Sequence, residues 1–171
     1  MKYALSILYI LNIIISNFFA STVLLNYNGL ITLIIGTLTF GFVFVLRDIL
    51  HKYGKNYVYL LIVISVILST LFNIVTNTPL QIVAASAIGL FIGEAVDTEI
   101  FQNLKNKSWI IRALSSNSIS VPIDSLLFNY IAFYGSELQG QKISLTIADI
   151  IYKFITAGFV SYSIYKSKLT T

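Results

Sequence analysis

The sequence predicts an all-α integral membrane protein with six transmembrane helices and both termini on the cytoplasmic side. The 171 residues are 57% hydrophobic and only 11% charged, with a mean hydropathy of +0.85, whereas about a quarter of the residues of a soluble domain are charged. The apolar residues fall into six long runs, and the basic residues collect in alternate connections between these runs. At this length we expect one transmembrane domain that comprises residues 1–171.

Each apolar run is close to the ~20 residues that a helix needs to cross the hydrocarbon core. The connections contain turn-forming residues, as in NYNG at 26–29 and TNTP at 76–79. The first run is longer than the apolar region of a signal peptide and lacks a good cleavage site, so we interpret it as a span. The expected spans are 3–25, 29–47, 57–77, 80–101, 114–135 and 143–165.

The basic residues predict the orientation of these spans. Eight of them precede the first span or follow the second, fourth and sixth, whereas the opposite side has only Lys142. Because Lys and Arg are enriched in cytoplasmic loops, both termini are expected inside, in the cytoplasmic membrane. In these loops the net charge of +4 favours anionic lipid headgroups over nucleic acid as a partner. The chain has no cysteine, which excludes disulfides and thiol chemistry.

Two acids in the fourth span, Glu94 and Asp97, are the first candidates for a functional site. An ionisable side chain at membrane depth costs about 2.5–3.5 kcal/mol, so it is expected to face the interior of the bundle. The two acids are three residues apart and share a helical face, whereas Glu99 points elsewhere. Either they are interfacial acids that pair with Arg47 or Arg112, or at least one of them lines a substrate site.

The end of the second span, FVLRDILHKYGK, carries three further ionisable residues. Arg47 either extends to the interface, as long basic side chains do, or has a pairing or gating role. Asp48 and His51 lie one turn apart, so the simplest expectation for His51 is a local hydrogen bond to Asp48. A lone histidine beside a basic loop is more often structural than catalytic.

The segment 113–135, ALSSNSISVPIDSLLFNYIAFYG, is unusually polar for a span. Its serines and Pro122 are explained if the helix starts there, with Ser115 or Ser116 as N-cap and the proline in an early turn. Alternatively, the proline marks irregular backbone, which survives at membrane depth only when it is buried or lines a wet cavity. Neither a cap nor a turn explains Asp124, which lies deeper in the span.

The sixth span contains Asp149 four residues before Lys153, the favourable order for a pair within one helix. Otherwise Lys153 would bridge to Asp124 or Asp97 across the bundle. Carboxylates, asparagines and abundant aromatic residues in one bundle suit a small, flat, polar ligand, because carboxylates accept paired N–H groups and aromatic rings stack on a planar face.

These motifs resemble a known family. FVLRDILHKYGK (44–55), FIGEAVDTEIFQNLK (91–105), SSNSISVPIDSLLFNYIAFYG (115–135) and DIIYKFI (149–155) are similar in order and spacing to the VUT family, the YhhQ-type queuosine-precursor transporters. The resemblance covers about residues 12–165. Two departures are a very short turn after the third span and the lack of a proline near the inner end of the sixth.

The resemblance implies a six-helix inner-membrane protein of bacterial or phage origin that imports 7-cyano-7-deazaguanine or 7-aminomethyl-7-deazaguanine. It needs no cofactor or metal. The matching polar positions are Asp48, Glu94, Asp97, Asp124 and Lys153. The expected substrate-binding residues are Glu94, Asp97, Asn117, Asp124, Asn129 and Lys153. Those expected to gate or to form ion pairs are Arg47, Asp48 and Arg112.

Three other classes of function remain as alternatives: an importer subunit, a membrane enzyme, either a protease or a transferase, and a pore. The substrate-binding subunit of an ATP-driven importer is also a small six-helix protein, but it usually has an A-x-x-x-A stripe on its first span, which is not found here. A membrane protease of the rhomboid type needs a Ser and a His in a suitable setting, and no G-x-S-x-G motif occurs. A headgroup transferase needs more clustered acids for metal binding than Glu94 and Asp97 supply. Inward-facing charges make a holin-like pore a poor fit.

Overall fold

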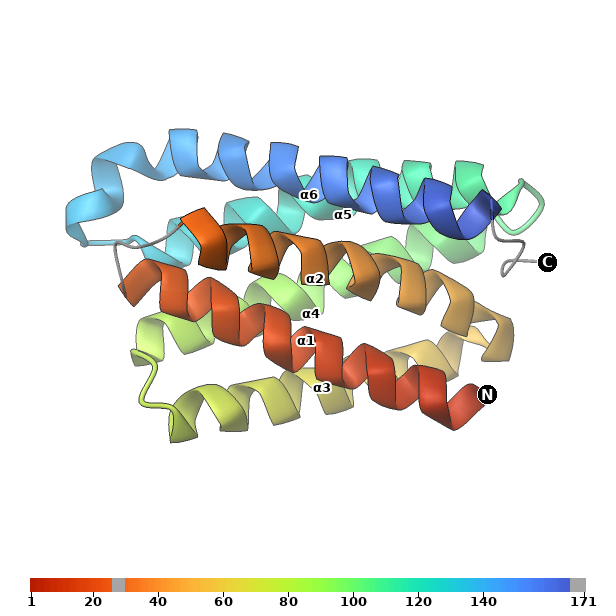
Figure 1. Cartoon of the computed structure of the whole chain (residues 1–171), viewed down its shortest axis with the longest axis horizontal. Helices are drawn as coiled ribbons and strands as arrows, with labels where there is room; N and C mark the ends of the chain where they lie inside the picture. Colours follow the sequence, from red (N-terminus) through yellow and green to blue (C-terminus); the bar gives the residue numbers. More distant parts are fainter. Residues whose placement is uncertain (26–29, 167–171) are drawn as a thin grey trace.

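The computed structural model describes the backbone of residues 1–25 and 30–166, with side chains for 1–19, 39–136 and 139–163 (Figure 1). In these residues the chain forms six long α-helices and two short 3₁₀ helices. They are α1 (Lys2–Leu25), α2 (Leu30–Leu50), η1 (His51–Tyr53), α3 (Lys55–Val75), α4 (Leu80–Asn103), α5 (Trp109–Ala132), η2 (Glu137–Gln141) and α6 (Lys142–Lys166). The expected turn at 26–29 and Lys168 lie outside the described residues.

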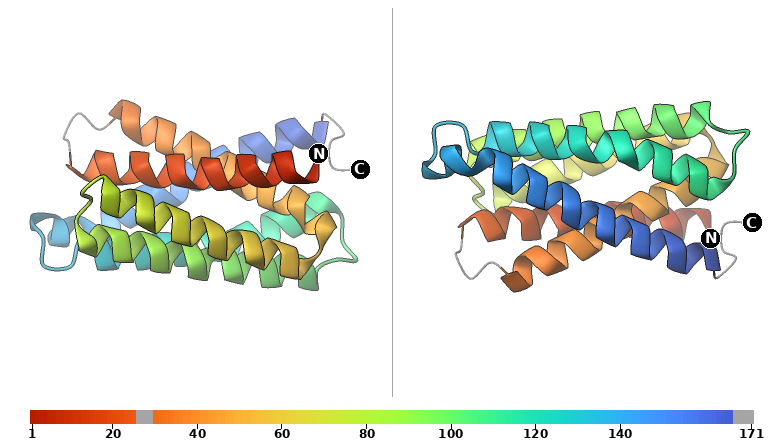
Figure 2. Two further views of the ribbon diagram at one scale, coloured as in Figure 1. Left: turned by 90° about the horizontal axis from the view of Figure 1, so that it is seen from below. Right: turned by 90° about the horizontal axis from the view of Figure 1, so that it is seen from above.

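The six α-helices form a closed ring in the order α1, α3, α4, α5, α6, α2 (Figures 1 and 2). Each helix packs against its two neighbours in this ring, and α4 and α5 have the most extensive contact. The second half of α2 also touches α3 and α5 across the ring. Side chains near the end of α2 can therefore reach both α4 and α5 in the interior.

The helices begin and end close to the expected positions, except at α5. Helix α5 begins at Trp109 after Ser108, five residues earlier than expected, so neither Ser115 nor Ser116 is its N-cap. Pro122 lies in the middle of α5, and the helix runs through it without interruption, so the expected irregular backbone is absent from this described segment. The proline removes one N–H from the helix, which leaves the carbonyl of Ser118 without its usual donor.

The distribution of polarity is that of a protein in lipid. Large apolar side chains point outwards, among them Ile155 at 61% and Phe159 at 69% exposure, while the buried set contains as many polar and charged side chains as apolar ones. Four described segments are long and apolar enough to cross a membrane. They are Lys2–Phe19, Lys55–Val75, Leu80–Asn103 and Gln139–Ser163. The side chains of α2 are described only from residue 39, and α5 is more polar.

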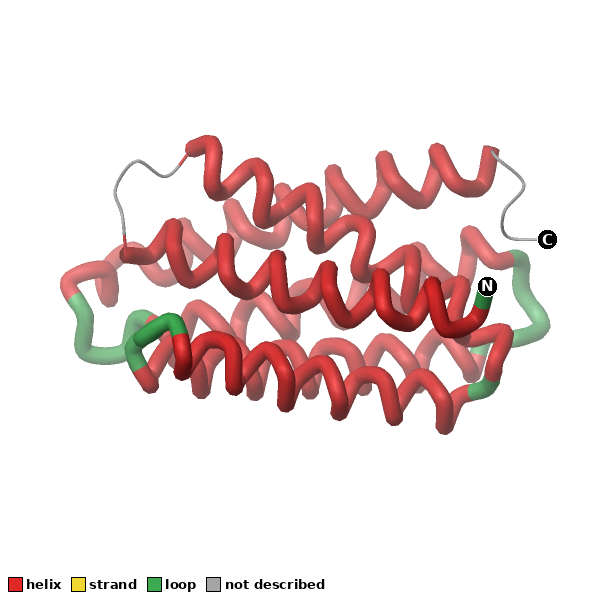
Figure 3. Tube along the Cα trace, turned by 60° about the horizontal axis from the view of Figure 1, so that its bottom comes forward, coloured by secondary structure: helices red, strands yellow, loops and turns green. Residues whose placement is uncertain are grey.

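The connections lie at the two ends of the bundle (Figure 3). The N-terminus, η1, the loop between α4 and α5 and the last turn of α6 share one end, and the turn 76–79 and η2 lie at the other (Figure 1). The first end carries the basic loop residues Lys52, Lys55, Lys105 and Lys107, so we call it the basic end. The charge asymmetry of the sequence is thus an asymmetry of the folded bundle.

Candidate functional site

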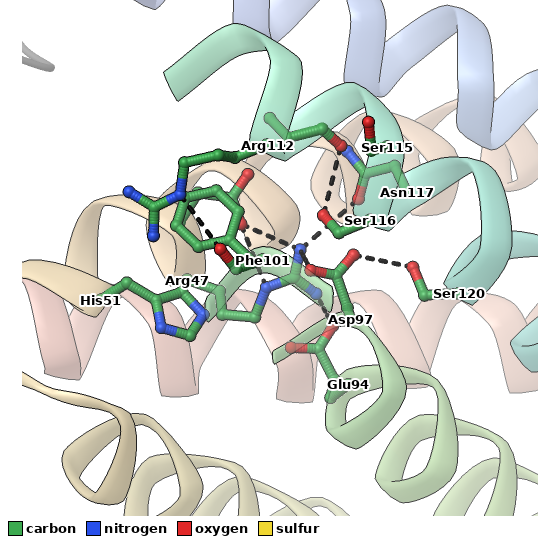
Figure 4. A network of polar contacts seen from close by, with 12 residues as sticks. Arg47, His51, Glu94, Asp97, Phe101, Arg112, Ser115, Ser116, Asn117 and Ser120 are labelled. Atoms are coloured by element: carbon green, nitrogen blue, oxygen red, sulfur yellow. Dashed lines mark hydrogen bonds and ion pairs between the residues drawn. The ribbon is translucent and has the colours of Figure 1, made fainter. Parts of the chain in front are cut away.

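Arg47 is the centre of the polar interior. It lies in the last turn of α2 and its side chain is 0% exposed, so it does not extend to the interface. Its guanidinium contacts three carboxylates: Asp97 at 2.8 Å, Asp48 at 3.0 Å and Glu94 at 3.1 Å (Figure 4). Of the two partners that the sequence allows for the acids of α4, Arg47 rather than Arg112 is therefore the one in place.

Glu94 and Asp97 are buried rather than interfacial. The two acids share one face of α4 because they are three residues apart, and both contact Arg47 of α2. Their side chains are 3% and 0% exposed. Glu94 lies nine residues before the end of α4, about 14 Å along the helix axis. Glu99 points away, as expected, and forms an exposed pair with Lys55 at 2.7 Å. One helix thus carries two buried acids and one exposed acid within six residues.

We call the four residues Arg47, Asp48, Glu94 and Asp97 the Arg47 cluster. Neutral side chains from α1 and α5 form hydrogen bonds with this cluster. The Tyr9 hydroxyl of α1 donates to Glu94 Oε2 at 2.8 Å. Ser120 of α5 donates to Asp97 Oδ2 at 2.7 Å, and Asn117 Oδ1 accepts from Arg47 Nη2 at 3.4 Å. The sequence analysis did not select Tyr9. A tyrosine inside an otherwise apolar span is a usable signal, because a buried phenol needs a partner.

The Arg47 cluster has more acceptors than its cation can satisfy. One guanidinium faces three carboxylates, and Asp48 Oδ2 is buried without a hydrogen-bond partner in the described part of the chain. Burying unpaired carboxylate oxygens is costly, and N–H donors offset that cost. Chemically, the cluster is suited to receive a ligand that presents N–H groups.

Phe101 is fully buried one helical turn after Asp97, on the side of the basic end. The His51 ring stacks on Phe101 with 4.6 Å between ring centroids, and the Arg112 guanidinium lies 3.9 Å from the Phe101 centroid. Arg112 Nε also donates to the Phe101 carbonyl at 3.0 Å. These contacts join η1, α4 and α5 (Figure 4).

His51 does not bond to Asp48, contrary to expectation. Gln102 Nε2 donates to His51 Nδ1 at 2.7 Å, which places the ring proton on Nε2. Burial, followed by the positive charges of Arg47 and Arg112, lowers the pKa of His51 to about 3. The ring is therefore neutral at physiological pH and stacks as an aromatic group.

A second buried cation, Lys153, forms a separate ionic cluster between α5 and α6. Its ammonium contacts Asp124 and Asp149, each at 2.8 Å, and Ser125 Oγ at 3.3 Å. The two alternatives considered for Lys153 thus occur together, with Asp124 rather than Asp97 as the cross-bundle partner. Asn129 joins neither cluster directly, since its amide donates to the carbonyl of Ser125 at 2.8 Å.

Two phenylalanines on α2 connect the ionic clusters. The Arg47 Cζ atom is 5.5 Å from the Phe44 ring, and Lys153 Nζ is 4.9 Å from the Phe40 ring. The centroids of these rings are 6.4 Å apart. Phe40, Phe44 and Arg47 lie on one face of α2 because they follow the i, i+4, i+7 spacing. The interior therefore has polar groups at both ends of an aromatic stretch.

Comparison with known proteins gives one match. The family described as "Putative vitamin uptake transporter" matches residues 57–166, which include most of α3 and all of α4, α5 and α6. This range contains Glu94, Asp97, Asp124 and Lys153, and Arg47 lies before it. No significant match is found among curated proteins or among solved structures.

Proposed function

The chain belongs to the vitamin uptake transporter family, and on this premise we propose that it imports a 7-deazaguanine precursor of the tRNA base queuosine. Family membership favours transport over catalysis and a small molecule as substrate. The preferred ligands are 7-cyano-7-deazaguanine and 7-aminomethyl-7-deazaguanine. In this proposal all six α-helices span the cytoplasmic membrane, with the basic end and both termini in the cytoplasm.

The excess of carboxylate acceptors in the Arg47 cluster carries the proposal. A guanine-like edge presents two neighbouring N–H donors, and a carboxylate accepts two such bonds side by side. Glu94 and Asp97 lie on one helical face at membrane depth, where water does not compete for these hydrogen bonds. Phe44, whose ring lies 5.5 Å from Arg47 Cζ, supplies aromatic surface for a planar ring beside the Arg47 cluster, and Phe40 extends this surface towards Lys153.

Substrate binding in this scheme is an exchange of partners. In the present state Glu94 and Asp97 are engaged by Arg47, at 3.1 and 2.8 Å. The N–H groups of a substrate would form hydrogen bonds with one of these carboxylates and so replace its ion pair with the Arg47 guanidinium. Since Arg47 belongs to α2 and the acids belong to α4, this exchange would loosen the link between the two helices. Binding and helix movement are thereby coupled through one side chain.

The closed basic end gives the proposed path a barrier. In this proposal Phe101 separates the Arg47 cluster from the basic loops, and it is held in place by His51 and Arg112. Arg112 would therefore control substrate release by holding Phe101 in place, rather than by forming an ion pair with Glu94 or Asp97. Release of a substrate to the cytoplasm would require this contact to open.

Genetic complementation tests the proposal. The chain is expressed in cells that neither make nor import the deazaguanine precursor, each precursor is supplied at nanomolar concentration, and queuosine in tRNA is assayed. We expect restoration by the wild-type chain, loss with Asp97→Asn, and normal restoration with Glu99→Gln. The last variant is the matched control, because Glu99 is an exposed acid on the same helix.

Two outcomes would contradict the proposal. Failure of every precursor to restore queuosine, with the protein present in the membrane, would exclude these substrates. Equal activity of the Asp97→Asn and wild-type chains would exclude the Arg47 cluster as the recognition site. Restoration only when an ATPase module is co-expressed would instead identify the chain as the binding subunit of an ATP-driven importer.

A further inference from the structure

Helices α4 and α5 approach each other closely where two glycines of α4 face one aspartate of α5. Gly89 and Gly93 are four residues apart and so lie on one face of the helix. A Cβ atom added at Gly93 would lie 2.8 Å from Asp124 Cβ, and one added at Gly89 would lie 3.0 Å from Asp124 Oδ1. Side chains larger than hydrogen at these positions would therefore displace Asp124. We call this feature the glycine notch.

This close approach is not shared by every helical glycine of the chain. A Cβ atom at Gly158 in α6 would meet no atom within 4 Å. At Gly41 in α2 it would meet the backbone of Thr156 at 3.1 Å, in a contact that involves no ionisable group. The chain thus supplies both an open glycine and a tightly packed glycine away from the ionic clusters, and these serve as controls.

Asp124 connects three helices because of its place in the notch. One carboxylate oxygen, Oδ1, faces Gly89 of α4, and the other, Oδ2, accepts from Lys153 of α6 at 2.8 Å. Gly93 directly precedes Glu94 in α4, so the notch lies beside a member of the Arg47 cluster. Asp124 is therefore the member of the Lys153 cluster that packs against α4.

We propose that Gly89 and Gly93 are positioning residues for substrate recognition, because the glycine notch holds the Asp124 carboxylate against α4, beside the residue that precedes Glu94, while it pairs with Lys153 of α6. The proposal rests on the proposed transport function and assigns a role to residues that touch no substrate. It explains why the most extensive helix interface of the ring contains a carboxylate at a point of close approach, where an apolar side chain would serve packing alone. The ligand class is unchanged: a flat heterocycle with an N–H edge, read by carboxylates on α4 and α5.

Transport kinetics of Gly93→Ala test the role in recognition. Displacing Asp124 removes one charge-assisted contact of about 1.4 kcal/mol or more, which corresponds to a rise in KM of roughly tenfold or greater. We expect Gly158→Ala to leave KM unchanged, and Gly41→Ala to lower thermal stability without raising KM. If Gly93→Ala acts through the Asp124–Lys153 pair, its effect on KM is not additive with that of Lys153→Gln. A wild-type KM for Gly93→Ala, or additive effects, would overturn the proposal.

A stability measurement tests the notch without relying on transport. The clash at Gly93 is with Asp124 Cβ, which an alanine retains and a glycine lacks. We therefore expect Gly93→Ala to lower Tm in the wild-type and Asp124→Ala backgrounds and to have little effect in the Asp124→Gly background. An equal fall in Tm in all three backgrounds would show that Gly93 does not pack against Asp124 Cβ and would overturn the proposal. If the wild-type chain transports no deazaguanine, the proposed function fails, and this cycle still decides whether the notch positions Asp124.

Discussion

Replacing Arg47 by glutamine perturbs the interior at its centre. Arg47 is the only cation within 3.1 Å of Asp48, Glu94 and Asp97 among the ion pairs of the described residues, and its side chain is fully buried. The variant keeps much of the side-chain volume and one amide donor but leaves three buried carboxylates without a counter-charge. We expect a large loss of stability, because uncompensated buried charge is far more costly than a lost surface pair.

The magnitude follows from the contacts. Removing one partner of a buried ion pair typically costs about 3–5 kcal/mol. A chain of 150–250 residues loses about 2–4 °C in Tm per kcal/mol, so the expected fall in Tm is roughly 6–20 °C. Lys55→Gln is the matched control, since it breaks a pair of similar length, 2.7 Å to Glu99, whose side chains are 42% and 46% exposed. That change should cost no more than about 1 kcal/mol.

Thermal unfolding of the purified protein in detergent is the assay. Adding Asp97→Asn to Arg47→Gln removes one of the orphaned carboxylates, so the double variant should recover part of the lost stability. This rescue separates electrostatics from packing, because asparagine has nearly the volume of aspartate. The reasoning is refuted if Arg47→Gln melts within 1–2 °C of the wild type, or if the second substitution lowers Tm further.

Three further predictions follow from the same structure. Tyr9→Phe removes the donor to Glu94 and should destabilise the protein by about 1.5–3 kcal/mol in the same thermal assay; an unchanged Tm would show that this bond contributes nothing. Because the pKa of His51 falls from 6.5 to about 3 on folding, the unfolded chain takes up this proton first, and stability is lost as pH falls through this range. His51→Asn should flatten that part of the pH–stability curve, and an identical slope in both proteins would argue against a neutral, buried ring. Single cysteines introduced at Asn106 and Gln139, in a chain without any other cysteine, should react with an impermeant thiol reagent in intact cells only at position 139; labelling at position 106 alone would reverse the proposed orientation.

The helical architecture could be predicted from the sequence because each apolar run has a length set by the bilayer. The turn after α3, at 76–79, was located correctly, since a proline, an asparagine and two threonines interrupt the apolar pattern there. The start of α5 was missed because the span was expected to begin at residue 114, after the basic residues Lys105, Lys107 and Arg112. Neither alternative for Pro122, an early helical turn or irregular backbone, matches its place in the middle of α5: a long helix packed against α4 tolerates one missing hydrogen bond.

The ionisable members of the two ionic clusters could be predicted from the sequence, but Tyr9 and Ser120 were missed and the connections were predicted only in part. Helical spacing places Glu94 and Asp97 on one face, and it also predicts the Asp149–Lys153 pair. Which cation meets which acid depends on how the ring of helices closes, and this order is not encoded in any one segment. The sequence therefore allowed both Arg47 and Arg112 as partners. The partner of His51 was missed for the same reason, because Gln102 lies on a different helix.

The glycine notch shows the limit of pattern analysis most clearly. Gly89 and Gly93 form a G-x-x-x-G spacing that favours close helix packing in membranes. Spacing alone does not identify the residue that occupies the gap, and an aspartate is an unexpected occupant. Only the packed α4–α5 interface places Asp124 there.

The central claim is that this chain by itself moves a deazaguanine across a membrane by using the acids of the Arg47 cluster. The most direct test is uptake of labelled 7-cyano-7-deazaguanine and 7-aminomethyl-7-deazaguanine into vesicles reconstituted with the purified protein alone. We predict uptake by the wild-type and Glu99→Gln proteins and none above empty vesicles for Asp97→Asn. Absence of uptake by the wild-type protein, or equal uptake by Asp97→Asn, would contradict the account.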